Sequence, residues 1–115
     1  MSDFYRNYLE EKGVSLRDIG LQERALTRSD ALGVIHLLKE GVSPILGGDV
    51  YFRLGSKIEV AYANWYSNKK AGENSEDFFV RSLAEATKYI ENFPHRADRE
   101  PLFSLVLDKG PEVVK

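Results

Sequence analysis

The sequence contains no cysteine among its 115 residues. Disulfide bonds, thiolate zinc sites, iron–sulfur clusters and a cysteine nucleophile are therefore all excluded. The sequence also lacks any apolar run near the ~20 residues that cross a bilayer. The N-terminus has no basic segment followed by an apolar run, which a secretory signal would need. We therefore expect no membrane association and a cytoplasmic location.

The sequence also lacks an excess of either charge. Sixteen basic residues face eighteen acidic ones, which gives a formal net charge of -2. This balance argues against a nucleic-acid partner, since such proteins carry a basic surface. Repeats and low-complexity segments are absent as well, and the length suits one domain over residues 1–115. We expect a frayed tail from about residue 109.

The first half of the chain carries the pattern of two helices. The first ends at Gly13, because glycine commonly follows a helix C-terminus. The second begins after Thr27, with Asp30 three residues later in the manner of a capping box, and stops before Gly41. Between these helices we expect a short helical turn followed by an extended piece at residues 23–26.

A change of period from about 3.6 to 2 marks the middle of the chain. Pro44 and the pair Gly47-Gly48 break the chain, and a strand follows over residues 50–54. Gly55-Ser56 makes a turn, and a returning strand begins at Ile58. The pattern predicts a β-hairpin with a short loop. Its alternation indicates that Tyr51 and Arg53 point away from the core.

The last third predicts a long helix and one more strand. The helix begins at Asn74 or Ser75 and ends near Asn92, because Pro94 disfavours helix at the residue before it. The strand covers residues 102–107. The order α-α-β-β-α-β predicts an α+β fold, with a small, mainly antiparallel sheet (the hairpin plus the C-terminal strand) packed by helices. A doubly wound nucleotide-binding sheet would need repeated βαβ units, which are missing.

Groups for catalysis are few. The two histidines, His36 and His95, lie in different predicted elements, and no Gly-x-Ser-x-Gly motif is present. Asp49 and Glu59 fall on facing strands of the hairpin, where two carboxylates are either surface charges or an acid–base pair. We interpret them as surface charges. We therefore expect no catalytic site, no metal and no cofactor.

Aromatic residues gather around the returning strand. Tyr51, Tyr62, Trp65 and Tyr66 fall close together, with Arg53 between them. Tyrosine, tryptophan and arginine are enriched at interface hot spots, because they bury a large area and keep a polar group. In a small domain such residues also fill the core, and for Trp65 both roles remain open. The cluster indicates a protein–protein interface.

Several stretches of the sequence resemble the immunity protein 40 family of bacterial polymorphic-toxin systems. The first is Pro44 to Tyr51 followed by Gly55, and the second is Tyr62-x-Asn64-Trp65-Tyr66. The later run from Phe79 to Pro94 and the strand at 102–106 are similar too. The resemblance covers roughly residues 21–107. The sequence departs from the family pattern at Ala63, where the family has an acidic residue.

This resemblance implies a cytoplasmic antidote that binds and neutralises a cognate toxin domain, with no reaction of its own. The residues expected to contact the toxin are Asp49, Tyr51, Arg53, Glu59, Tyr62, Trp65 and Tyr66. Three alternatives remain: an adaptor of an unrelated assembly, a small-molecule binder with a pocket between sheet and long helix, and a hydrolase that uses Asp49 and Glu59. The identity of the toxin and the oligomeric state stay open.

Overall fold

The computed structural model describes residues 2–108, and the tail expected to fray from about residue 109 lies outside them. Helices and strands are mixed along these residues without a regular βαβ alternation, as expected for the α+β class. The elements are α1 (Ser2–Lys12), β1 (Val14–Ser15), the 3₁₀ turn η1 (Arg17–Ile19), β2 (Arg24–Thr27), α2 (Arg28–Leu38), β3 (Ile45–Leu54), β4 (Lys57–Tyr66), α3 (Ser75–Asn92) and β5 (Glu100–Leu107).

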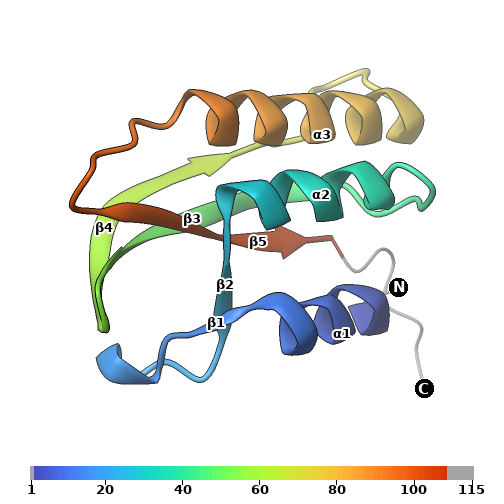
Figure 1. Ribbon diagram of the computed structural model, residues 1–115. Helices are drawn as coiled ribbons and strands as arrows, with labels where there is room; N and C mark the ends of the chain where they lie inside the picture. The colour runs from blue at the N-terminus through green and yellow to red at the C-terminus, as the bar shows by residue number, and fades with distance from the viewer. Residues whose placement is uncertain (1, 109–115) are drawn as a thin grey trace.

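The strands form one antiparallel sheet in the order β1-β2-β5-β3-β4. The central strand β5 therefore pairs with β2 on one side and β3 on the other. Figure 1 shows α3 and α2 side by side over the sheet, with α1 beyond α2. The predicted fold class is confirmed. The extended piece expected at residues 23–26 is the strand β2, which joins the sheet through a partner far away in the sequence.

Local signals place most helix ends correctly. The Thr27 hydroxyl accepts a hydrogen bond from the amide of Asp30 at 3.2 Å, as the capping pattern predicts. Asn74 caps α3 in the same way, with its side chain accepting from the Asp77 amide at 2.8 Å. The helix α3 ends at Asn92, two residues before Pro94. These ends depend on neighbours within a few residues, so the sequence suffices to find them.

The expected break at Gly47-Gly48 is wrong. β3 begins at Ile45 and runs through both glycines without interruption. A Cβ at Gly47 would collide with the backbone oxygen of Trp65, and one at Gly48 would collide with the Trp65 ring. Glycine is needed here for close approach inside a strand, because the tryptophan ring occupies the space of a side chain.

The core has two parts, one on each face of the sheet. The larger part lies between the sheet and the three helices, with Val50, Phe103 and Leu105 facing α2 and α3. The smaller part lies on the opposite face, where the segment 14–21 places Leu16 against Tyr51. This segment covers the hairpin end of that face. Within residues 2–108, no helix is long and apolar enough to span a membrane.

Candidate partner-binding surface

The helix-free face of the sheet is covered at one end and exposed at the other. The exposed residues at the uncovered end come from β3, β4 and β5, and we call this surface the open face. It consists of Asp49, Val60, Tyr62, Asn64, Tyr66 and Val106. Cross-strand pairing brings them together, because Asp49 lies opposite Asn64 and Gly47 lies between Tyr66 and Val106. Residues paired across neighbouring strands share a face of the sheet.

Two tyrosines dominate the open face. Tyr62 is 92% exposed and Tyr66 is 76% exposed. Tyr62 sits in a β-bulge where the register of β3 and β4 shifts, and its φ of 57° is the one positive value at a non-glycine residue in the described chain. Ala61 and Ala63 on either side pack against the larger core. The bulge therefore directs the Tyr62 side chain away from the helices and into solvent.

The alternation of β4 continues through this bulge. Ile58, Val60 and Tyr62 lie on the same side of the sheet, opposite the helices, but only Ile58 is buried there, because it packs in the smaller core. Val60 is 40% exposed. Two residues of β4, Ala61 and Tyr62, lie between the partners of Val50 and Tyr51, and an even number of extra residues leaves the later side chains on the same faces. A bulge is set by the pairing of two strands, so the alternation within one strand did not signal it.

The same geometry separates Asp49 from Glu59. Asp49 pairs with Asn64 on the open face, while Glu59 pairs with Phe52, which lies on the helix-covered side. The two carboxylates therefore point to opposite faces of the sheet, and the acid–base pair that a hydrolase would need is not assembled from them. Among residues 2–108, no group of three or more His, Cys, Asp or Glu residues could hold a metal ion.

The exposed position expected for Tyr51 is wrong. Its side chain is only 5% exposed, because the segment 14–21 packs over this end of the sheet. The Tyr51 hydroxyl donates to Oε2 of Glu23 at 3.2 Å. Burial, together with the neighbouring negative charge of Glu23, raises the pKa of Tyr51 to about 12. Tyr51 thus holds the segment before β2 onto the sheet.

Arg53 and Glu59 each lie beside a residue of opposite charge. The Arg53 guanidinium bonds Oε1 of Glu100 through Nε at 3.0 Å and Nη2 at 2.7 Å. Glu59 lies 4.0 Å from Arg99. Both side chains remain partly accessible, but a partner that engages them must compete with these pairs. They lie at the hairpin end, away from Tyr66.

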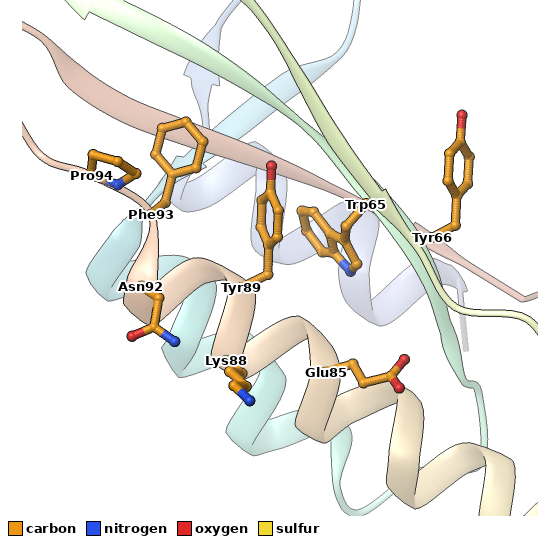
Figure 2. Close-up of a pocket in the computed structure, with 8 residues that line it drawn as sticks. All are labelled: Trp65, Tyr66, Glu85, Lys88, Tyr89, Asn92, Phe93 and Pro94. Atoms are coloured by element: carbon orange, nitrogen blue, oxygen red, sulfur yellow. The ribbon is translucent and has the colours of Figure 1, made fainter.

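Trp65 belongs to the core instead of the open face. It is 8% exposed and stacks on Tyr89 of α3, with ring centroids 4.6 Å apart. Beside this stack, a groove of about 560 Å³ runs between β4 and α3, and Figure 2 shows the two rings side by side, one from each wall. We call it the aromatic groove. Its lining residues are Trp65, Tyr66, Glu85, Lys88, Tyr89, Asn92, Phe93 and Pro94.

Some polar groups of the aromatic groove have hydrogen-bond partners and others have none in the part of the chain that the structure describes. Glu85 accepts from the Ser67 hydroxyl and from Arg81 Nη1, so its charge is compensated, and its pKa is lowered chiefly by the Ser67 hydrogen bond. Within the described residues, the side chains of Lys88 and Asn92 take part in no hydrogen bond or ion pair. The indole nitrogen of Trp65 is buried and likewise has no partner. The groove therefore presents hydrogen-bond donors that are free to bind an acceptor.

The sequence-based prediction thus located part of the surface. Asp49, Tyr62 and Tyr66 lie together on the open face, whereas Tyr51 and Trp65 are buried, and Arg53 and Glu59 lie at the hairpin end. The aromatic groove was missed. Its signal was the pair Tyr89 and Phe93, which lie four residues apart at the C-terminal end of α3 and directly after it. The register that places Trp65 beside them was needed to interpret this signal.

Comparison with known proteins identifies a family for this chain. The family model described as Immunity protein 40 matches residues 15–107, which include the strands β2 to β5 and the helices α2 and α3. No curated protein and no solved structure matches the chain. The match covers most of the chain and spans both the open face and the aromatic groove. The chain therefore belongs to the immunity protein 40 family.

Proposed function

We propose that this protein is a bacterial, cytoplasmic immunity protein that binds a cognate toxin and blocks its activity. The family match over residues 15–107 is the observation that carries this proposal, since the family's name denotes immunity to a toxin. The partner is a protein, and the action is stoichiometric binding instead of a reaction. No nucleic acid, membrane, metal or cofactor is required.

The open face is the surface that suits such a partner best. It offers two exposed tyrosines and two exposed valines around Asp49 and Asn64. Tyrosine is enriched at hot spots, because a rigid ring covers a large area at low entropic cost and its hydroxyl can form hydrogen bonds. The Asp49 carboxylate has no hydrogen bond or ion pair within residues 2–108, so its charge is available to a basic group of the toxin.

The first test is co-expression with the protein encoded immediately upstream of this chain. We expect that protein to be toxic alone, and cells to survive when both are made and form a stoichiometric complex. A toxic upstream protein that this chain neither binds nor neutralises would contradict the proposal. An upstream protein that is harmless and forms no complex would contradict it equally.

The second test assigns the surface. The double variant Tyr62→Ala/Tyr66→Ala removes both exposed rings, and we expect it to weaken toxin binding by about 2 kcal/mol or more. Val80→Ala is the matched control, because Val80 is 61% exposed on α3, away from the open face. Unchanged affinity of the double variant would show that the toxin docks elsewhere.

A further inference from the structure

The strand β4 is an edge of the sheet. Among the described strands it pairs only with β3, so one side of its backbone has no strand beside it. An edge of this kind is a template for another strand, and proteins usually protect it with charges, proline or bulges. The first half of β4 has such protection, with Lys57, Glu59 and the bulge at Tyr62. Residues 63–66 carry no charge and no proline.

The hydrogen-bond pattern identifies the backbone groups that face outward. The amide of Ser67 donates to the carbonyl of Leu46 at 2.9 Å, in direct continuation of the pairing of Tyr66 with Gly47. In an antiparallel ladder, residues alternate between pointing both backbone groups at the partner and pointing both away. Trp65 therefore bonds to β3, as Ser67 does. The N–H and C=O of Asn64 and Tyr66 point to the free edge.

The aromatic groove lies directly beside this part of the edge. Trp65 is on the helix-covered side of β4, between Asn64 and Tyr66, and stacks on Tyr89. A strand added along the edge would place the residue opposite Trp65 on the same side, with its Cβ about 5 Å from that of Trp65. Its side chain would then enter the space between β4 and α3 shown in Figure 2.

The groups that line this space define what that side chain must be. The unpaired Lys88 ammonium and the Asn92 amide lie on the α3 wall, while the compensated carboxylate of Glu85 adds little negative charge. The Trp65 indole N–H is the one buried side-chain polar atom without a hydrogen-bond partner in residues 2–108. Buried donors without a partner are rare in native proteins, so this one indicates an acceptor from outside. A carboxylate matches donors and a cation together.

We propose that the toxin docks by adding an extended segment to β4. This segment pairs with the outward backbone groups of Asn64 and Tyr66 and places an acidic side chain in the aromatic groove beside Lys88 and Trp65. The inference rests on the proposed function and names the part of the surface that recognises the toxin. Backbone pairing gives affinity, and the groove gives selectivity for the acidic residue.

Two pairs of variants test the proposal by titration against the purified upstream-encoded protein. Asn64→Pro removes the outward N–H and leaves the hydrogen bonds between β4 and β3 intact. Asn64→Ala removes the side chain and keeps the N–H. Lys88→Glu reverses the charge in the groove, and Lys12→Glu makes the same change on α1. We expect Asn64→Pro and Lys88→Glu each to raise Kd by about tenfold or more, a loss of ~1.4 kcal/mol. Asn64→Pro should bind at least about tenfold more weakly than Asn64→Ala, and Lys12→Glu should bind nearly as the wild type does.

A measurement on the unchanged chain covers the case in which Asn64→Pro does not fold. In the free ¹⁵N-labelled chain, the amides of Asn64 and Tyr66 should exchange rapidly and that of Trp65 slowly. In the complex all three should exchange slowly. The sequence has one tryptophan, so its indole N–H gives a single resonance, which should shift on binding.

The outcomes separate this inference from the proposed function. Edge pairing would be overturned, and the immunity function would stand, if a neutralising complex forms in which Asn64→Pro and Lys88→Glu bind normally. The same would follow if the Asn64 and Tyr66 amides stay unprotected in that complex. A free chain that dimerises through β4, with those amides already protected, would overturn edge pairing as well. Absence of any neutralising complex would remove both.

Discussion

At the scale of single residues, Gly48 and Trp65 form a matched pair across β3 and β4. They lie opposite each other in the ladder, and a Cβ at Gly48 would collide with the indole ring and with the Ser104 carbonyl. The absent side chain lets the ring lie flat on the strand and reach Tyr89. Gly48 thus sets the position of the Trp65 ring, which lines the β4 side of the aromatic groove.

This pairing predicts how Trp65 responds to substitution. Trp65→Ala should lower the free energy of unfolding by about 3–5 kcal/mol, because it leaves a cavity over Gly48 and removes the stack on Tyr89. Chemical denaturation monitored by circular dichroism measures the change. Tyr66→Ala is the control, since its ring is 76% exposed, and it should alter stability by no more than ~0.5 kcal/mol. A Trp65→Ala variant as stable as the wild type would show that the stack contributes little.

At the scale of elements, one arginine holds the loop before α3 onto that helix. Arg81 bonds both carboxylate oxygens of Glu73 at 2.8 Å, the Asn68 carbonyl at 2.7 Å and Glu85 at 3.0 Å. These bonds hold the pKa of Glu73 at about 2, chiefly through the hydrogen bonds from Arg81. They also raise the pKa of Arg81. The loop after β4 is thereby fixed next to the aromatic groove.

The lowered pKa of Glu73 predicts acid sensitivity with a definite sign. Because the folded state binds this proton less tightly than the unfolded state, the stabilisation is complete above the unfolded pKa of about 4.5 and is lost as pH falls toward 2. Denaturation at several pH values should therefore show a smaller decline for Glu73→Gln than for the wild type. Glu76→Gln, at the exposed start of α3, should keep the wild-type slope. Parallel curves for all three proteins would contradict the assignment.

At the scale of the whole molecule, the sheet connects two cores. β3 contributes Val50 to the core beneath the helices and Tyr51 to the core beneath the segment 14–21. β5 does the same with Phe103 and Leu102. Neighbouring residues of one strand thus belong to opposite cores. Neither core can open without disturbing the strands against which the other core packs.

This arrangement predicts that the chain unfolds as one cooperative unit, in agreement with the single domain expected from its length. Scanning calorimetry should give one transition, with the calorimetric and van't Hoff enthalpies equal. Leu16→Ala, at the centre of the smaller core, should lower the midpoint of that same transition. A second transition in either protein would show instead that the segment 14–21 unfolds separately.

Much of the fold follows from local patterns. The caps of α2 and α3, the turn at Gly55-Ser56 and the end of α3 before Pro94 depend on residues within a few positions, so the sequence predicts them. The amphipathic stripe of α3 and the alternation of β3 are local as well. Two of the exposed contact candidates, Tyr62 and Tyr66, were found by composition alone.

The sequence by itself therefore determined most of the elements, the α+β class and the family, but not β1 or the place of β2 in the sheet. Only the tertiary structure decided which surface is free. The bulge at Tyr62 changes the register of β4 against β3, and the segment 14–21 buries Tyr51 and Ile58 but leaves Val60 and Tyr62 exposed on the same face. The aromatic groove also arises from tertiary packing, because it joins Trp65 to residues of α3 more than twenty positions away. Burial and register depend on distant chain segments, which local patterns do not specify.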